Sequence, residues 1–456
     1  MKNHIRNSAT WLALSAALAL SCNKLIEIPA AKDQIENGVV FSDSTITSTA
    51  LLGAYYTMGT VHSSMKYVSL YADEYAVTSA TTTNAEYANS QLLSTNTNNA
   101  SLWSSLYSVI YQCNSILEGT GQSSPISPLA KKQLRGEAKF LRAFAYFNLV
   151  GFYDHIPLIL GTEVTANRSA AQASSAAVFS QMVQDLNESE QELSPAYAGA
   201  GRVRANSFCA SALLARIHLF QQNWQAAAEA ASRVINSGLY NTKDVKPENV
   251  FLAGSAETIL QLWMINGFLT DAAQLIPASA TLIPAYPIRT GLYSALENTD
   301  LRKTRWISTN TVTSGGQTTT YPYPAKYKAR AAGSPNPEFV MALRMGEQYL
   351  IRAEALAKLM QLPGSIADIN LIRARAGLSA LGSSLDQEGC LAAIADQRRI
   401  ELYGEWGLRF LDLKRNSLLD VTLGILKPNW KTTAKAFPIP NNEIIYNRNL
   451  IQNDGY

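Results

Sequence analysis

Apolar residues recur every three or four positions over long parts of the chain, a pattern typical of helices with one buried face. The clearest example is 131–152, where Leu134, Leu141 and Leu149 fall on one stripe with small alanines between them. The same spacing predicts further helices over 178–193, 206–222, 224–237, 338–360 and 365–376. The hydrophobic pattern therefore predicts a mostly α-helical protein.

Two pairs of these helices are separated by very short connections, one at Gln222–Asn223 and one at Pro363–Gly364. The spans of the pairs fit tetratricopeptide-like hairpins of about 34 residues. Such hairpins stack because neither helix can bury its apolar face alone. We therefore expect helical hairpins that form a superhelical scaffold, and the alternative is ordinary helix packing without a superhelix.

Two segments interrupt the helical pattern. The segment 73–100 is rich in Thr, Asn, Ser and Ala and reads as a long polar excursion. The segment 263–328 is rich in Pro, Gly and aromatic residues, and Thr309–Thr311 and Gly315–Gly316 indicate short strands within it. Long irregular insertions on a helical scaffold are usually functional, so we expect the binding chemistry there.

The N-terminus has the three parts of a secretory signal: a basic start, an apolar run over Ala9–Leu20, and a small residue before Cys22. The apolar run is too short to span a bilayer, which takes about 20 residues. The stretch Leu18–Cys22 resembles a bacterial lipobox, so residues 1–21 are expected to be a lipoprotein signal peptide. Acylation of Cys22 would then anchor the chain to a membrane. The alternative is an ordinary signal peptide followed by a chance cysteine.

Composition excludes several classes of function. A formal net charge of +3 is too small for an electrostatic nucleic-acid binder. The remaining cysteines, Cys113, Cys209 and Cys390, are widely spaced in apolar runs and are expected to be buried free thiols. No histidine or cysteine spacing typical of a metal site is present, and no cofactor motif stands out.

Several motifs resemble the SusD/RagB family of outer-membrane nutrient-binding lipoproteins. They include the start of the mature chain and two helical motifs, at Cys22–Pro29, Glu137–Leu149 and Leu343–Ala355. The most specific matches are C-terminal, at Arg398–Arg415 and Phe437–Tyr456. The resemblance implies a SusD-like fold with an N-terminal region over 22–240 and a C-terminal RagB/SusD region over 241–456. It also implies a place at the outer membrane beside a SusC-type TonB-dependent transporter that receives the nutrient.

No catalytic motif is present, so the sequence predicts a binding protein rather than an enzyme. Glu401 and Glu405 would share a helix face, but the arginines around them favour a structural ion network over acid/base catalysis. Sugar rings stack on aromatic faces while their hydroxyls need polar partners. The expected ligand-binding residues are Tyr286, Tyr293 and Trp306 as stacking platforms, with Asp73 and Tyr87 from the polar excursion.

Four functions stay open at this point. The leading one is capture of oligosaccharides for the transporter, and the second is capture of oligopeptides or another small nutrient. A surface hydrolase and a purely architectural repeat protein are the other two. The sequence itself does not specify the ligand.

Overall fold

The structure is a computed structural model that describes residues 37–331 and 337–456, so the predicted signal peptide and Cys22 lie outside the described residues. Most of the described chain is helical, as predicted. The first helices are α2 (Asn37–Val40), α3 (Ser44–Val61), α4 (Met65–Tyr71), α5 (Thr82–Ala88), α6 (Thr97–Gln122), α7 (Pro128–Tyr153), α8 (Val164–Arg168), α9 (Ser175–Glu192), α10 (Ser207–Phe220) and α11 (Trp224–Ile235). They are followed by α12 (Leu269–Leu275), α13 (Thr290–Ala295), α14 (Leu301–Arg305), α15 (Met345–Lys358), α16 (Leu362–Arg375), α17 (Gln387–Glu401), α18 (Leu408–Arg415), α19 (Leu419–Leu426) and α20 (Asn441–Tyr446). Single 3-10 turns cover His62–Ser64, Pro247–Asn249 and Thr432–Lys435.

The strands are short and form three separate two-stranded antiparallel sheets. They are β1 (Ile156–Pro157) with β2 (Gln172–Ala173), β3 (Thr258–Leu262) with β6 (Val340–Arg344), and β4 (Ile307–Ser314) with β5 (Gln317–Pro324). The sheets are too small to organise the molecule, so the architecture is set by the helices.

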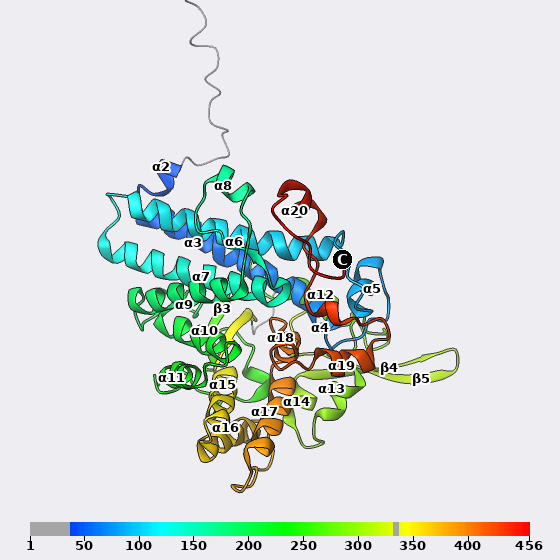
Figure 1. The fold of residues 1–456 in the computed structure, drawn as a ribbon. Coiled ribbons are helices and arrows are strands. Elements are labelled where there is room, and N and C mark those ends of the chain that lie inside the picture. The colour runs from blue at the N-terminus through cyan, green and yellow to red at the C-terminus, as the bar shows by residue number, and fades with distance from the viewer. Residues whose placement is uncertain (1–36, 332–336) are drawn as a thin grey trace, which may run out of the picture.

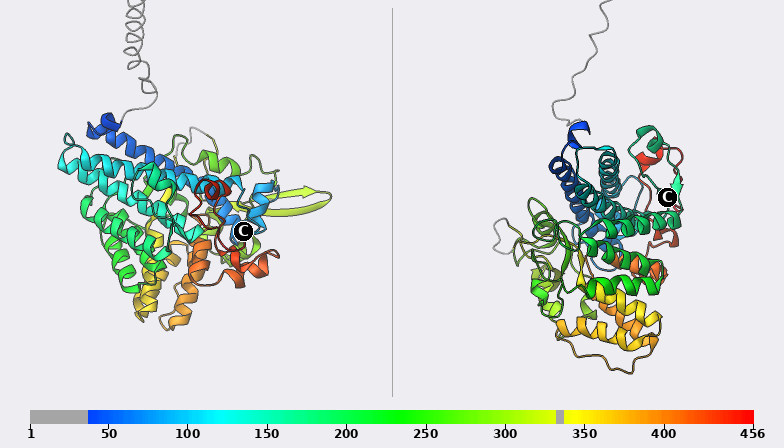
Figure 2. Two further views of the ribbon diagram at one scale, coloured as in Figure 1. Left: turned by 45° about the horizontal axis from the view of Figure 1, so that its top comes forward. Right: turned by 90° about the vertical axis from the view of Figure 1, so that its left-hand side faces the viewer.

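The long helices form one continuous stack (Figure 1; Figure 2). Each packs on the next: α3 on α6, α6 on α7, α7 on α9, α9 on α10, α10 on α11, α11 on α15, and α15 on α16 and α17. This is the tetratricopeptide-like scaffold that the repeated hairpins predict. The contact between α11 and α15 joins the two predicted regions, 22–240 and 241–456, and the division between them stays a prediction.

Helix α7 shows how the sequence sets these elements. The Ser127 hydroxyl accepts a hydrogen bond from the Ala130 N–H at 3.3 Å, and Pro128 occupies the first turn, where its missing N–H costs nothing. Most of the following helix is buried because it lies between α6 and α9. Its buried Arg142 guanidinium donates two hydrogen bonds, of 2.8 and 2.7 Å, to the Asp185 carboxylate of α9.

Three sequence predictions were wrong. The connection expected at Pro363–Gly364 lies inside the first turn of α16, which starts at Leu362. The predicted helix 338–360 starts only at Met345, because Val340–Arg344 forms strand β6 against β3. A short apolar run fits a buried strand as well as a buried helix, so periodicity alone does not separate them. The polar excursion 73–100 contains helix α5 and the start of α6. The Asn96 side chain caps α6 by accepting hydrogen bonds from the N–H groups of residues 98 and 99.

The aromatic-rich insertion 263–328 contains the strands that its turn residues indicate. Strands β4 and β5 form a hairpin that projects from the molecule, with Ser314 opposite Gln317 (Figure 1). Gly315 and Gly316 both have positive φ, 59° and 80°, the conformation that a two-residue hairpin turn requires. The insertion also contains the short helices α12, α13 and α14, which the sequence analysis did not predict.

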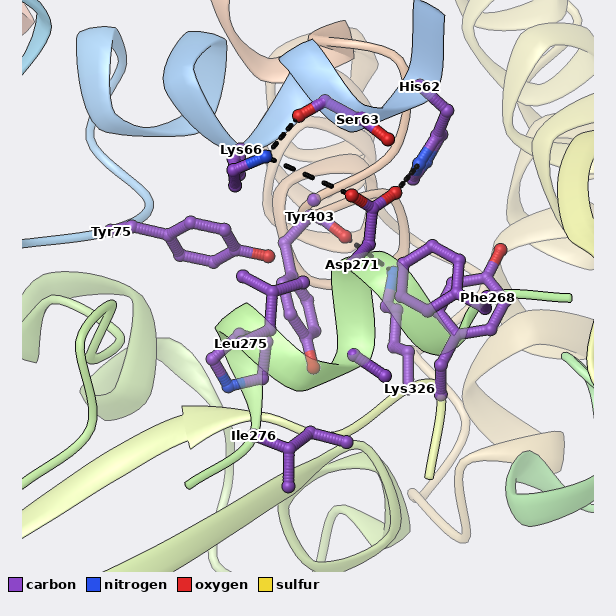
Figure 3. A pocket seen from close by; sticks show the side chains of 14 residues that line it. His62, Ser63, Lys66, Tyr75, Phe268, Asp271, Leu275, Ile276, Lys326 and Tyr403 are labelled. Carbon is purple, nitrogen blue, oxygen red and sulfur yellow. Dashed lines mark hydrogen bonds and ion pairs between the residues drawn. The ribbon is translucent and has the colours of Figure 1, made fainter. Parts of the chain in front are cut away.

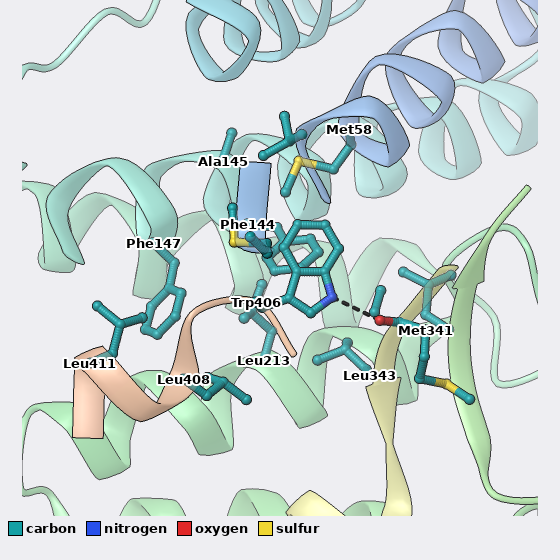
Figure 4. Close-up of a cluster of buried hydrophobic side chains, with 14 of the residues drawn as sticks. Met58, Phe144, Ala145, Phe147, Leu213, Met341, Leu343, Trp406, Leu408 and Leu411 are labelled. Atoms are coloured by element: carbon teal, nitrogen blue, oxygen red, sulfur yellow. Dashed lines mark hydrogen bonds between the residues drawn. The ribbon is translucent and has the colours of Figure 1, made fainter. Parts of the chain in front are cut away.

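The core is closed by the loop between α17 and α18. Trp406 lies on this loop and is 1% exposed. Its indole packs against Phe144 of α7, at 4.7 Å between ring centroids, and Nε1 donates a 2.7 Å hydrogen bond to the Met341 carbonyl of β6 (Figure 4). One side chain thus joins the N-terminal helices, the β3–β6 pair and the C-terminal motif.

Candidate functional site

The polar excursion and the aromatic insertion lie against each other, as a shared binding surface requires. The Ala76 N–H donates to the Pro287 carbonyl at 2.8 Å, and the Arg289 N–H donates to the Glu74 carbonyl at 2.9 Å. A third backbone hydrogen bond, of 3.1 Å, runs from Thr78 N–H to the Ala285 carbonyl. Two segments about two hundred positions apart are therefore held as one unit.

The structure buries both residues expected from the polar excursion. The carboxylate of Asp73 accepts hydrogen bonds from Arg409 at 2.7 and 2.8 Å and from Arg399 at 3.0 Å. Burial opposes ionisation, but the two guanidinium groups hold the pKa of Asp73 below its usual value. Tyr87 is 1% exposed and stacks on Tyr67 at 5.5 Å. In this structure both side chains join elements of the protein to one another.

Two of the three expected stacking aromatics are buried as well. Trp306 has no exposed surface, and its indole N–H donates to the Pro247 carbonyl at 2.7 Å. The Tyr286 hydroxyl accepts a 3.0 Å hydrogen bond from the Asn84 amide, and burial raises the pKa of Tyr286 to about 12. Tyr293 alone is partly exposed, with the Lys303 ammonium 5.0 Å from its ring centre. Ligand contact by the five residues stays a prediction, and in this structure only Tyr293 offers a ligand much of its surface.

A small cavity lies beneath the junction of the two segments (Figure 3). In it Asp271 of α12 faces His62 and Lys66, with its carboxylate oxygens 3.5 Å from His62 Nδ1 and 3.9 Å from Lys66 Nζ. Burial raises the pKa of Asp271, but contact with His62 and the charge of Lys66 outweigh it, so the net shift is downward. The free volume is about 30 Å³, room for a water molecule but far below the 300–1,000 Å³ typical of organic ligand sites. These contacts attach α12 to the scaffold.

Glu401 and Glu405 belong to a buried ion network, which confirms the structural interpretation of this pair. Glu401 binds Arg302 at 2.9 Å and Arg344 at 2.5 Å, and Glu405 binds Lys326 at 2.5 Å. Burial alone would raise both pKa values, but the neighbouring cations hold the pKa of each carboxyl below its usual value. A general acid needs a raised pKa, so this pair does not fit the acid/base chemistry of glycoside cleavage.

A larger cleft lies elsewhere, between α6, α8 and α20, with a volume of about 410 Å³. We call it the aromatic cleft. Its lining residues include Trp103, Tyr107, Tyr111, Pro157, Ile159, Val164, Asn167, Arg168, Glu443, Tyr446 and Asn447. In Figure 1, α8 and α20 lie beside α6 at the end of the molecule where α2 begins the described chain. The volume is that of an ordinary ligand-binding site.

The aromatic cleft combines stacking faces with polar groups. The rings of Trp103 and Tyr107 lie at its base, 5.0 Å apart between their centroids. The Tyr107 hydroxyl donates to the Pro157 carbonyl at 2.9 Å. At the rim, Tyr111 is 52% exposed and Tyr446 is 70% exposed. Exposed aromatic side chains that face a cleft offer the flat apolar surface on which the weakly polar face of a sugar ring stacks.

Charged groups in the aromatic cleft balance each other. Burial raises the pKa of Glu443, although a hydrogen bond from Trp103 opposes this shift. Within residues 37–331 and 337–456 the Arg168 side chain forms no ion pair, so its guanidinium group can donate to a ligand. One carboxyl and one guanidinium group give the cleft both acceptors and donors without a strong net charge, which suits a neutral hydroxylated ligand.

Sequence reasoning missed this cleft because it expected the binding chemistry in 73–100 and 263–328, and the lining residues of the cleft lie outside both segments. Trp103 is buried, at 2% exposed, but it forms the floor of an open site. The signal in the sequence was Tyr107 and Tyr111, four positions apart on one face of α6. The third wall comes from α20, more than three hundred positions later, and no local pattern predicts that contact.

Two general features bear on the class of protein. No helix within 37–331 or 337–456 has the length and hydrophobicity to cross a bilayer. In the same described residues, no three His, Cys, Asp or Glu side chains are grouped as metal ligands would be. The cysteines at 113, 209 and 390 are free and buried, as predicted.

Comparison with known proteins finds two family models that match this chain. Residues 31–219 match a family model described as starch-binding and associating with the outer membrane, and residues 229–456 match the SusD family model. A SusD-like protein P25 of Formosa agariphila is 26% identical over an alignment of 416 positions. The alignment covers 77% of this chain and 78% of that protein. The similarity therefore extends over most of both chains.

Solved structures show the same fold. A SusD superfamily protein from Bacteroides vulgatus superposes with a TM-score of 0.80 at 22% identity, covering 91% of this chain and all of that one. A laminarin-binding SusD-like protein superposes with a TM-score of 0.76 at 24% identity, covering 90% of this chain and 99% of the other. The overall fold is therefore that of the solved structures, and this chain belongs to the SusD family.

Proposed function

We propose that this protein captures oligosaccharides in the aromatic cleft and passes them to a SusC-type TonB-dependent transporter in the outer membrane. The observation that carries the proposal is the cleft itself, about 410 Å³ lined by aromatic faces, one carboxyl and one guanidinium group. Family membership supports it, because the model matched over 31–219 describes starch-binding proteins that associate with the outer membrane. The laminarin-binding relative supports a glycan as the ligand.

Anchoring through an acylated Cys22 fits this function. Cys22 precedes the first described residue, Asn37, by 15 positions, which span at most about 50 Å when fully extended. The chain enters the structure at α2, at the same end as α8 and α20 (Figure 1). The anchor would therefore hold the aromatic cleft within reach of a transporter in the same membrane.

Isothermal titration calorimetry tests the proposal directly. The mature chain is titrated with laminarin, soluble starch and a mixed oligopeptide digest. We expect heat from at least one polysaccharide, and loss of about tenfold in affinity on Tyr446→Ala, equivalent to about 1.4 kcal/mol. Tyr56→Ala is the matched control, because Tyr56 is an exposed tyrosine on α3 outside the cleft.

The alternatives give distinct results. If the peptide digest binds and neither polysaccharide gives heat, the result would favour oligopeptides as the ligand of this protein. Glycan binding that Tyr293→Ala weakens and Tyr446→Ala leaves intact would move the site to the aromatic insertion. Pull-down of the tagged protein from its own membranes tests the transporter, and recovery without a large β-barrel protein would contradict that part of the proposal.

A further inference from the structure

The aromatic cleft adjoins a second hollow at Tyr111. This hollow, of about 400 Å³, lies beside it along α6, lined by Phe41, Ser115, Glu118, Gln122 and Pro125 among others. Tyr111 and Thr162 line both hollows. The two hollows are therefore neighbours, and we call them together the α6 groove.

The α6 groove follows one face of the helix. Ser104, Tyr107, Tyr111, Ser115, Glu118 and Gln122 line it in turn. Steps of three and four residues keep side chains on one face of a helix. At 1.5 Å per residue, the stretch from Ser104 to Gln122 is about 27 Å long. A single sugar ring would fill only a fraction of that length.

The loop beside the groove is fixed to the helix. The Glu118 carboxylate accepts hydrogen bonds from the Thr162 N–H at 2.9 Å and from its hydroxyl at 2.5 Å. These bonds hold the loop that precedes α8 against α6. The wall shared by the two hollows is therefore set by direct hydrogen bonds rather than by a free loop.

The far end of the groove is equally well defined. The Ser123 hydroxyl donates to the Phe41 carbonyl at 2.7 Å. The Phe41 ring lies directly over Gly119, where a β-carbon would collide with it. Glycine at this position lets the Phe41 ring approach α6 closely and form the end wall of the hollow.

The groove offers aromatic and polar groups along its length. Tyr107 and Tyr111 line the aromatic cleft, and the Phe41 ring lies over Gly119. Ser115 and Glu118 lie between Tyr111 and Phe41, and Gln122 lies beyond them. An oligosaccharide presents the same combination, since ring faces are weakly apolar and the edges carry hydroxyls. A single apolar ligand would cover the Ser115 hydroxyl and the Gln122 amide without pairing them, which costs free energy.

We infer that the α6 groove binds an extended neutral oligosaccharide along the helix, with Tyr111 stacking on a ring at the midpoint. The inference rests on the proposed glycan capture and specifies its ligand as a chain of several sugar units. Affinity should therefore grow with chain length until the ligand reaches Gln122. A site confined to the aromatic cleft would stop gaining affinity once that cleft is filled.

The test titrates two series of glucose oligomers, laminari- and malto-oligosaccharides from the disaccharide to the heptasaccharide, into the mature wild-type chain and two variants. Ser115→Trp places a bulky ring in the middle of the groove. Gln122→Ala removes a polar group at its far end. Ser180→Trp is the control, because Ser180 is exposed on α9, away from α6.

In the better-binding series, we expect the affinity of the wild type to rise at least tenfold from the shortest to the longest oligomer. Ser115→Trp should abolish that gain while the disaccharide binds as in the wild type, and Gln122→Ala should reduce it. Affinity that levels off at the trisaccharide, or variants that follow the wild type, would overturn the extended groove and leave glycan capture standing. Silence of the wild type with every oligomer would contradict both proposals. Thermal unfolding of each variant confirms that it is folded.

Discussion

The Arg344 guanidinium group binds both oxygens of the Glu405 carboxylate, at 2.8 Å from Nε and 2.9 Å from Nη2. Arg344 ends strand β6, while Glu405 lies in the loop after α17, and both are buried. The pair thus attaches the C-terminal motif to the centre of the molecule. Arg344 also binds Glu257, just ahead of β3, at 2.9 Å.

Removing Arg344 should strongly destabilise the protein. Arg344→Met leaves the Glu405 carboxylate buried without its main partner, and breaking a buried pair in this way costs about 3–5 kcal/mol. Urea denaturation measures the free energy of unfolding. Arg233→Met is the control, because its pair with Glu190 is largely exposed and should change stability by less than about 1 kcal/mol. Equal losses in the two variants would contradict a central role for the buried network.

A second prediction concerns Glu74, whose carboxyl is buried beside the Gly404 N–H. Burial raises its pKa from 4.5 to about 7. The unfolded chain therefore releases this proton near pH 4.5 and the folded chain releases it only near pH 7. Between these values the folded state holds more protons, so stability falls as the pH rises, by about 3 kcal/mol in total for this group.

Glu74→Gln removes the titrating group and keeps an acceptor for the Gly404 N–H. We expect the variant and the wild type to have similar stability at pH 4, and the variant to be the more stable by a few kcal/mol at pH 8. Chemical denaturation at several pH values gives the difference. Glu229→Gln serves as the exposed control and should show no such trend. If the stability difference between Glu74→Gln and the wild type does not change with pH, the Glu74 carboxyl is not the source of the pH dependence.

Much of the fold was predictable because helical periodicity is a local signal. The predicted helix 131–152 differs from α7 by three residues at its start and one at its end. Strand β6 was missed for the opposite reason, since Val340–Arg344 becomes a strand only because β3, some eighty positions earlier, supplies its partner. Local patterns identify an element, but pairing across the chain decides between two elements that fit equally well.

The candidate site was less predictable. The sequence analysis expected the binding chemistry in the two insertions, but it could not tell an aromatic side chain that faces solvent from one that fills the core. Trp306 shows the difficulty, because its indole is enclosed by three cations, with Lys326 4.8 Å from the ring centre. No pattern in the sequence indicates Tyr446, although it is the most exposed tyrosine of the aromatic cleft. Burial depends on tertiary contacts that composition does not encode.

Gly407 provides a prediction about close packing. Its φ is +65°, and a β-carbon there would lie 2.7 Å from Val68 Cγ1 and 3.0 Å from the Phe152 ring. Gly407→Ala therefore adds both backbone strain and crowding next to the Trp406 loop. We expect a loss of more than about 1 kcal/mol in the free energy of unfolding.

Gly238→Ala separates the two costs. Gly238 has a similar φ of +71°, but a β-carbon there would meet no atom within 4 Å. This variant should pay only the backbone strain and lose less stability than Gly407→Ala. If the two variants lose the same amount, crowding by Val68 and Phe152 makes no contribution and the packing argument fails.

The last prediction concerns the membrane anchor. Wild-type protein should incorporate radiolabelled palmitate and sediment with the outer-membrane fraction, because two or three acyl chains contribute about 0.8 kcal/mol per buried methylene group. Cys22→Ala should lose the label and leave the membrane fraction. Cys390→Ala is the matched control. That thiol is buried in the folded domain, so its substitution should leave labelling unchanged.

Co-purification with the transporter is a second measurement on Cys22→Ala. If the unanchored protein still co-purifies with a β-barrel partner, protein contacts hold it at the membrane. If Cys22→Ala instead carries label and sediments as the wild type does, another site is acylated and the geometry proposed for the anchor is wrong.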